Sequence, residues 1–116
     1  MIHMADGLFS MEADFFKALA HPTRIRIIKH LAENERCVCE FTDDLDIEQS
    51  NISQHLAVLR KQGIVSFRKD VLRVMYKVSY PQILEVIGLV DNMLLSRANE
   101  TFSFLRNEDG SSWSQE

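Results

Sequence analysis

The stretch Ile47–Gly63, IEQSNISQHLAVLRKQG, decides how this chain is organised. On a helix with about 100° per residue, Ile52, Leu56 and Leu59 fall within roughly 60° of one another and form a narrow apolar stripe. The other side carries small or hydrogen-bonding side chains: Ser50, Asn51, Ser53, Gln54, Ala57 and Lys61. Short side chains let a helix approach the major groove of DNA, and amides and hydroxyls can bond base edges. The stretch therefore predicts a DNA-reading helix closed by Gly63, with an ordinary solvated helix as the alternative.

The segments before this helix are also helical in pattern. Apolar residues from Leu8 to Leu19 follow helical spacing and predict a first amphipathic helix that ends near Ala20. Pro22 suits the first turn of a second helix, expected to reach about Glu33 and to bury Ile25, Ile28 and Leu31. A short third helix over 40–45 and a turn at 46–47 then lead into the reading helix. This order predicts a helix-turn-helix.

After Gly63 the apolar period changes from 3.6 to 2. One strand is expected over 64–67, a turn over 68–70, and a second strand in which Leu72, Val74, Tyr76 and Val78 alternate with Arg73, Met75, Lys77 and Ser79. The result is a hairpin with a basic tip, a wing. Its bases Arg68, Lys69 and Arg73 would meet phosphates or a minor groove, and a solvated loop is the alternative.

The longest helix is expected from Tyr80 to about Leu105. Its apolar arc is wider than the roughly 100° that one small core covers, so we expect it to pack on its own domain and on the same helix of a second subunit. Such a dimer spaces two reading helices about 34 Å apart, one turn of DNA. The expected dimer contacts are Phe15, Phe16, Ile83, Val86, Ile87, Val90, Met93 and Leu94.

Length and composition limit the possible classes. A chain of 116 residues is one domain with a modest core, which favours oligomerisation. The formal charge of −4 argues against indiscriminate coating of nucleic acid. Charge is segregated, with five acids and no base over 40–54, then six bases and one acid over 55–77. No signal peptide pattern and no apolar run near 18 residues occur, so we expect a cytoplasmic protein without a membrane partner.

We therefore expect a mainly α fold with a β-hairpin wing: a winged helix-turn-helix of about five helices that dimerises through its first and last helices. A flexible N-terminus is expected over 1–7, the winged helix-turn-helix domain with its dimerisation helices over 8–106, and a disordered tail over 107–116. An enzyme is not expected, because the chain has no Gly-rich phosphate loop, no G-x-S-x-G and no paired-carboxylate site.

Cys37 and Cys39 are separated by one residue and do not form a secreted disulfide framework, so we expect free thiols or ligands. Three interpretations remain open. The pair ligates a thiophilic metal or metalloid ion. It senses thiol oxidation or sulfur species. Or both residues are small, partly buried side chains without any ligand.

Three stretches carry a resemblance to a known family: ALAHPTR at 18–24, CVCEF at 37–41 and SNISQHLAVLRKQGIV at 50–65, with Tyr76 in the wing. From about Phe15 to Leu95 the chain resembles the ArsR/SmtB family of winged-helix repressors, and the third stretch is highly specific. The resemblance implies a homodimer that binds double-stranded operator DNA and releases it when an inducer binds, commonly a metal or metalloid ion. It places Gln49, Ser50, Ser53 and Gln54 at DNA-contacting positions. Glu48 stands where the family often has a capping Ser.

The CVCEF stretch looks like the metal box of arsenic-, antimony-, cadmium- and lead-responsive members. The third cysteine of arsenic-sensing members is Thr42 here, so a complete site needs a ligand such as His3, His21 or Asp43. The family's zinc site on the last helix uses histidines and acids, and 80–105 contains no His, so that site is expected to be absent. The candidate inducers are As(III), Sb(III), Cd(II), Pb(II) and Zn(II), with Cys37 and Cys39 as ligands.

The leading hypothesis is thus a homodimeric repressor released from its operator by an inducer. The expected DNA-binding residues are Gln49, Ser50, Asn51, Ser53, Gln54, His55, Ala57, Lys61, Arg68, Lys69 and Arg73. A winged helix that docks another protein through its acidic 40–48 segment is the second hypothesis, and steep salt dependence of DNA binding would separate the two.

Overall fold

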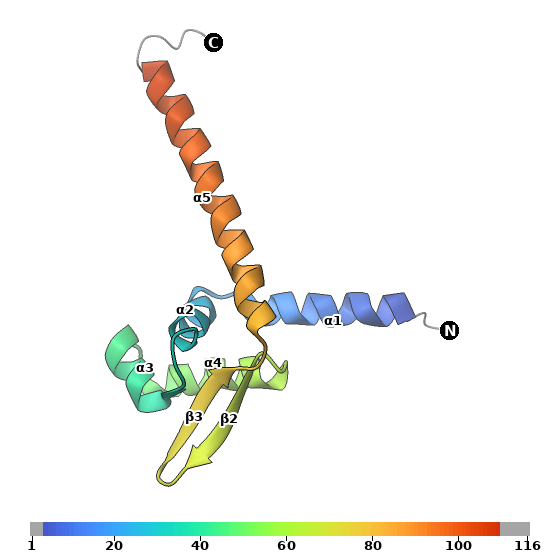
Figure 1. Ribbon diagram of the computed structural model, residues 1–116, viewed down its shortest axis with the longest axis vertical. Helices are drawn as coiled ribbons and strands as arrows, with labels where there is room; N and C mark the ends of the chain where they lie inside the picture. The colour runs from blue at the N-terminus through green and yellow to red at the C-terminus, as the bar shows by residue number, and fades with distance from the viewer. Residues whose placement is uncertain (1–3, 110–116) are drawn as a thin grey trace. The chain divides into compact units, whose positions relative to one another are not determined.

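The computed structural model describes residues 4–109, and the side chains of residues 4–106 (Figure 1). The elements in chain order are α1 (Met4–Leu19), α2 (Pro22–Leu31), β1 (Arg36–Cys37), α3 (Val38–Leu45), α4 (Gln49–Lys61), β2 (Val65–Asp70), β3 (Arg73–Val78) and α5 (Pro81–Asp109). The predicted winged helix-turn-helix is confirmed. The chain divides into two compact units, the first ending at Leu84 and the second beginning at Glu85. Within the described residues, no helix is long and apolar enough to cross a membrane.

The outer helices are longer than the sequence pattern predicted. Residues 4–7 belong to α1, with Asp6 in its first turn, where a negative charge meets the positive end of the helix dipole. Residues 107–109 belong to α5, because no glycine or proline interrupts the chain between Pro81 and Gly110 except Gly88. The rest of the expected flexible N-terminus, 1–3, and of the expected disordered tail, 110–116, lies outside the described residues.

The break between α1 and α2 occurs at the predicted residues. His21 is the N-cap of α2, and its Nδ1 accepts a hydrogen bond from the backbone N–H of Thr23 at 3.0 Å. Pro22 occupies the first turn. Ile28 and Leu31 are buried as predicted, but the third buried residue is Ile27, and Ile25 is only half-buried. The prediction was wrong there because the core-facing arc of about 100° runs through Ile27, which leaves Ile25 at its edge.

The core of the first unit lies where α2, α3 and the wing contact α4. Its fully buried side chains are Phe41, Ile27, Ile28, Ile52, Leu56, Leu59, Ile64 and Val65. The predicted stripe of α4 is confirmed, since Ile52, Leu56 and Leu59 are at most 1% exposed. Each such side chain contributes about 1.5–3 kcal/mol by leaving water. Burial of this stripe fixes which way the opposite face of α4 points.

Three antiparallel strands form a sheet in the order β1-β3-β2. The turn of the wing is Val71–Leu72, and the predicted turn residues 68–70 are the end of β2. Met75 is buried, whereas the alternation placed it outward. The alternation failed because β1 adds to β3 and sets Cys37 opposite Met75, so both side chains share the core face. Tyr76 lies on the other face beside Phe67, with ring centroids 5.9 Å apart.

Candidate DNA-binding surface and cysteine pair

The outer face of α4 is open to solvent in the described structure. Its exposed side chains are Gln49, Ser50, Asn51, Ser53, Gln54, Ala57 and Lys61. The helical pattern assigned all of these residues except Gln49 to the side opposite the apolar stripe, and Gln49 was placed there by the family resemblance. The arrangement offers hydroxyl and amide groups on a rigid helix, and a small residue at the centre that permits close approach to a flat or grooved partner.

Both ends of α4 are defined by backbone geometry. Gly63 has a φ of +73°, which suits glycine, and the N–H of Ile64 donates to the carbonyl of Leu59 at 2.9 Å. The predicted stop at Gly63 is confirmed. At the other end, Glu48 is the N-cap and its side chain makes no capping hydrogen bond, as expected for glutamate.

His55 is placed differently from the other predicted DNA-binding residues. It is half-buried, its Nδ1 accepts a hydrogen bond from Nε of Arg24 at 3.1 Å, and its ring centroid lies 4.4 Å from that of His21. Nη1 of Arg24 also donates to the carbonyl oxygen of Ala18. His55 therefore joins α4 to the start of α2, because it lies at the edge of the apolar stripe and not on the outer face.

The free energy of unfolding should decrease on acidification because His55 becomes protonated. Burial lowers the pKa of the His55 imidazole, and the charges of His21 and Arg24 lower it further. As pH falls below 6.5, the ordinary pKa of histidine, His55 takes up its proton more readily in the unfolded chain than in the folded chain. The contribution of His55 to stability is therefore complete above pH 6.5 and is lost as pH falls through its lower pKa in the folded chain. Urea unfolding of wild type and His55→Gln from pH 8 to 5, at one fixed protein concentration, should give curves that diverge below pH 6.5, with wild type losing more. Parallel curves would contradict this linkage.

The basic residues near the tip of the wing differ in their contacts. Arg68 forms a two-pronged ion pair with Glu35, with Nη2–Oε1 and Nε–Oε2 distances of 2.8 and 3.2 Å. The hydrogen bond from Arg68 lowers the pKa of the Glu35 carboxyl. Lys69 and Arg73 are exposed. Sequence reasoning missed Glu35, since nothing in a surface turn indicates a partner more than thirty residues away.

Cys37 and Cys39 form a disulfide in the structure, so the expectation of free thiols was wrong. Cys37 is buried at the end of β1 and is the N-cap residue of α3, whereas Cys39 lies exposed in the first turn of α3. The change from strand to helix at this junction brings the two Cα atoms to 5.4 Å, within the range that a disulfide spans. The backbone N–H of Cys37 also donates to Oε1 of Glu40 at 2.9 Å.

A charged cluster surrounds this junction. Arg36 has a side chain only 16% exposed and lies 3.2 Å from Glu33, 3.7 Å from Glu40 and 4.0 Å from Asp44. Asp44 is also 2.9 Å from Nε2 of His30. Two acids of the 40–48 segment therefore face the cluster, which leaves fewer for docking another protein.

The predicted additional ligands do not gather at the cysteines. His21 caps α2 and contacts His55, Asp43 is exposed, and His3 lies outside the described residues. In the part of the chain that the structure describes, no three His, Cys, Asp or Glu residues are placed to hold a metal ion. In the disulfide form that the structure shows, the two sulfurs are bonded to each other and cannot ligate a trivalent metalloid, so such an ion would need the reduced pair.

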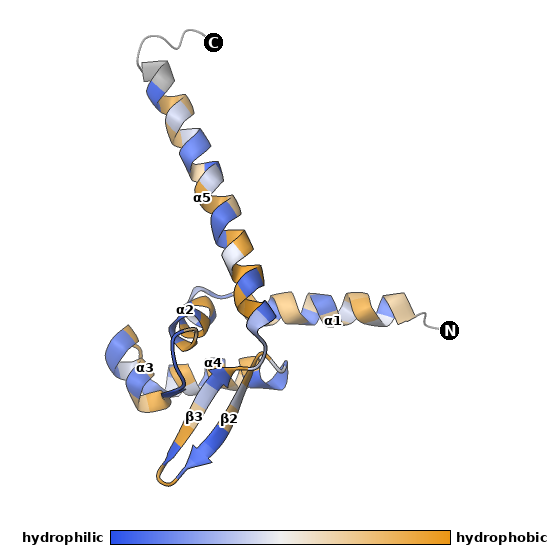
Figure 2. Cartoon of the chain, in the orientation of Figure 1, coloured by the Kyte–Doolittle hydropathy of each residue, from blue (hydrophilic) through white to orange (hydrophobic). Residues whose placement is uncertain are grey.

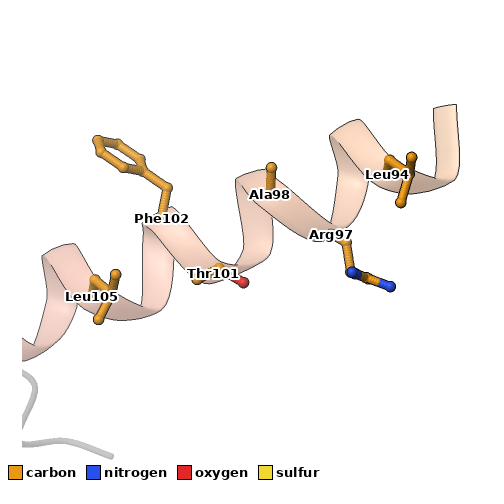
Figure 3. Close-up of a pocket in the computed structure, with 6 residues that line it drawn as sticks. All are labelled: Leu94, Arg97, Ala98, Thr101, Phe102 and Leu105. Carbon is orange, nitrogen blue, oxygen red and sulfur yellow. The ribbon is translucent and has the colours of Figure 1, made fainter. Parts of the chain in front are cut away.

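The predicted dimer residues differ in exposure. In the first unit, Ile83 is buried, Phe15 is half-buried and Phe16 is 57% exposed. In the second unit, Ile87 is buried and Val86 half-buried, but the exposed large apolar side chains are Leu89, Val90, Met93, Leu94, Leu95, Phe102, Phe104 and Leu105. Figure 3 shows a shallow concavity along α5 lined by Leu94, Arg97, Ala98, Thr101, Phe102 and Leu105. Apolar surface of this extent is typical of an interaction site.

Comparisons with known proteins place this geometry in context. A family model described as "Bacterial regulatory protein, arsR family" matches residues 21–66. The HTH-type transcriptional regulator Rv0081 of Mycobacterium tuberculosis is 41% identical over 91 residues, covering 78% of this chain and 80% of the relative. Its crystal structure superposes with a TM-score of 0.75 at 38% identity, over 82% of this chain and 96% of that one.

One further relative and one structure of the same fold are also similar. The transcriptional activator HlyU of Vibrio cholerae is 38% identical over 84 residues, covering 72% of this chain and 77% of the relative. A structure described as reduced HlyU has a TM-score of 0.69 at 32% identity, over 79% of this chain and 97% of that one. The homodimeric winged helix-turn-helix domain of Mb0332 from Mycobacterium bovis shares the fold, with a TM-score of 0.79 at 23% identity over 86% of this chain and 93% of that one.

Proposed function

This chain belongs to the ArsR family of bacterial transcriptional regulators, and from that premise we propose that it binds operator DNA as a homodimer, reads it with α4 and responds to the state of Cys37 and Cys39. The family consists of DNA-binding regulators and not of enzymes. The observation that carries the proposal is the exposed hydroxyl- and amide-bearing face of α4, opposite a stripe that is fully buried. Two such helices related by a twofold axis read two half-sites of one operator.

Several features support the homodimer. A relative of the same fold is described as homodimeric. The exposed apolar side chains of α5 lie on a helix of 29 residues, long enough to pair with a second copy along much of its length. Phe16 of α1 adds exposed aromatic surface. A chain of this size with so much uncovered apolar surface is stabilised by a partner subunit.

Repression is the regulatory sign that we propose. A dimer bound to an operator sterically excludes other proteins from the same stretch of duplex and needs no additional domain or partner to do so. Relatives of this chain include proteins named as repressors and one named as an activator. Whether binding represses or activates transcription therefore has to be measured at the regulated promoter. A reporter fused to the regulated promoter measures it, with higher expression expected when the gene is deleted.

The cysteine pair is proposed to respond to thiol oxidation. In the step, two thiols become one disulfide and lose two protons and two electrons. The acceptor is hydrogen peroxide, which becomes two waters, an organic hydroperoxide, which becomes an alcohol and one water, or a small disulfide, which becomes two thiols. The bond joins the end of β1 to the first turn of α3, and α3 packs directly on α4. Oxidation thus stiffens the support of the reading helix, which hinders its adjustment to the groove.

Oxidised protein should therefore bind operator DNA about 5–150-fold more weakly than reduced protein, the usual size of such coupling. The probe is a duplex enriched by reduced wild-type protein from a random-sequence pool. Affinity is measured by fluorescence anisotropy after dithiothreitol or hydrogen peroxide treatment, with the thiol state checked by mass. Cys37→Ser and Cys39→Ser should bind equally under both conditions. Equal affinity of wild type in both verified states would contradict the redox proposal and leave the DNA-binding proposal standing.

A thiophilic ion is the second candidate effector, favoured by the adjacency of two sulfur atoms at this junction. Titration of reduced protein with As(III), Sb(III), Cd(II), Pb(II) and Zn(II) tests it through thiolate charge-transfer absorption and operator affinity. A change in affinity that requires both cysteines would replace oxidation by metal binding as the signal. DNA affinity without salt dependence would instead favour the protein-docking hypothesis for the 40–48 segment.

A further inference from the structure

The tip of the wing is apolar and almost fully exposed. Val71 and Leu72 form the two-residue turn between β2 and β3, and they are 94% and 93% exposed. Figure 2 shows this loop as a hydrophobic segment between the polar ends of the two strands. Few large hydrophobic side chains of the described chain are as exposed. This tip is not among the residues assigned to DNA binding by the helical or charge pattern.

The backbone conformation at the tip is unfavourable for a valine at position 71. Val71 has a φ of +52°, a left-handed conformation that is unfavourable for a β-branched residue. Two-residue hairpin turns normally use Gly, Asn or Asp at such a position. A residue held in this region destabilises the fold and persists where the surroundings or the function require it. At 94% exposure, no packing within the described residues offsets the cost.

Positive charge flanks the tip on both strands. In the strand register of the hairpin, Asp70 lies opposite Arg73 and Lys69 lies opposite Val74. Lys69 and Arg73 are therefore within two residues of the turn, on opposite strands. Both are exposed, while Arg68 is bound to Glu35. Asp70, the residue next to the tip in β2, is negatively charged, and its Oδ2 lies 4.0 Å from Nη1 of Arg68. An apolar tip with Lys69 and Arg73 behind it on the two strands matches the minor groove of duplex DNA, which has a narrow floor between two rows of phosphates.

The wing is also held against the reading helix. Arg60 of α4 lies over the ring of Phe67 in β2, 4.3 Å from its centroid, and α4 contacts β2 within the same compact unit. When α4 occupies a major groove, the hairpin is therefore carried to the same duplex. A membrane or an unrelated protein surface would not explain why the tip is tied to this helix.

We propose that Val71 and Leu72 form an apolar contact in the DNA minor groove beside the half-site read by α4, and that this contact selects deformable or A·T-rich flanking steps. The inference rests on the proposed function. Apolar side chains in the minor groove unstack or widen base steps, and the cost of doing so depends on sequence. Lys69 and Arg73 contact the adjacent phosphates and carry no sequence information.

The test replaces the tip by Asn-Gly, in the double variant Val71→Asn/Leu72→Gly. Asn tolerates the positive φ of residue 71 better than Val, and Gly accepts either sign of φ at residue 72, so the wing should fold at least as well, which thermal unfolding checks. On the duplex enriched by reduced wild-type protein from the random-sequence pool, hereafter the selected duplex, affinity should fall roughly tenfold. The dependence of affinity on salt should not change, because no phosphate contact is lost. Leu72→Ser alone should show the same change to a smaller extent. The matched control Lys69→Ala should lower the slope of log K against log salt by about 0.9 on every sequence.

A second measurement locates the contact. With 2-aminopurine placed in the flank of the half-site, wild type should raise its fluorescence by unstacking, and the Asn-Gly variant should not. The inference would be overturned if wild type and the Asn-Gly variant bound with equal affinity and equal preference for the flanking sequence. It would also be overturned if the variant showed a smaller slope of log K against log salt, because that indicates a lost phosphate contact. If wild type enriches no sequence from the random pool, the proposed function fails and the minor-groove role fails with it.

Discussion

Replacing Ser53 and Gln54 together by alanine should lower affinity for the selected duplex by at least about 100-fold. Both side chains are exposed on the outer face of α4, and each lost contact to a base edge costs about 1–3 kcal/mol. Alanine is a better helix former than either residue, so the helix itself should not weaken. The loss should be largest on the selected sequence and small on random duplex, since base contacts carry specificity and phosphate contacts do not.

The measurement is anisotropy on both duplexes at fixed salt, with unfolding followed in parallel. Gln82→Ala is the matched control, because Gln82 is equally an exposed amide on a helix but stands in the first turn of α5. It should bind as wild type does. A double variant that keeps the full affinity and preference of wild type would remove α4 as the reading helix, whatever becomes of the cysteine pair.

Phe41→Ala should lower the free energy of unfolding by about 3–5 kcal/mol. Phe41 is fully buried in α3, with its ring 5.5 Å from that of His30 in α2. Removing the ring leaves a cavity at the place where α3 meets the core, which the surrounding helices cannot fill without moving. For a protein of marginal stability, such a loss is a large fraction of the total.

Urea unfolding at one fixed protein concentration measures this loss, because stability of a dimer depends on concentration. Tyr80→Ala is the control: Tyr80 is an aromatic residue 62% exposed, and its replacement should change stability by no more than about 0.5 kcal/mol. Comparable losses in the two variants would mean that Phe41 does not anchor α3. The operator affinity of Phe41→Ala should fall as well, since α3 supports α4.

Periodicity predicted the parts of the fold whose signals are local. Burial of one narrow stripe orients α4 whatever lies around it, so Ile52 and Leu56 were assigned to the core from spacing alone. Pro22 ends one helix and starts another through its own ring, and Gly63 ends α4 through its freedom to adopt positive φ. These signals act within a few residues and need no tertiary information.

The wing shows where local signals mislead. A polar Arg-Lys-Asp run looks like a turn, but these residues are paired in β2, and the turn falls on an apolar pair that carries no turn signal. Met75 was expected to face outward because only tertiary structure reveals that β1 pairs with β3. The same limit applies to Glu35, whose ion pair with Arg68 joins two distant segments.

The candidate sites divide in the same way. By itself, the sequence determined which face of α4 is exposed, since a helix that buries one side must expose the other. It also determined that two cysteines lie together, but not that they bond, because the spacing of Cys37 and Cys39 suits a strand, a helix or the junction between them. Only the tertiary structure decided that the junction lies between these residues, that His55 turns toward His21 and Arg24, and that an apolar tip leads the wing. Those outcomes depend on which elements pack side by side, and packing between segments far apart in the chain leaves no periodic trace in either one.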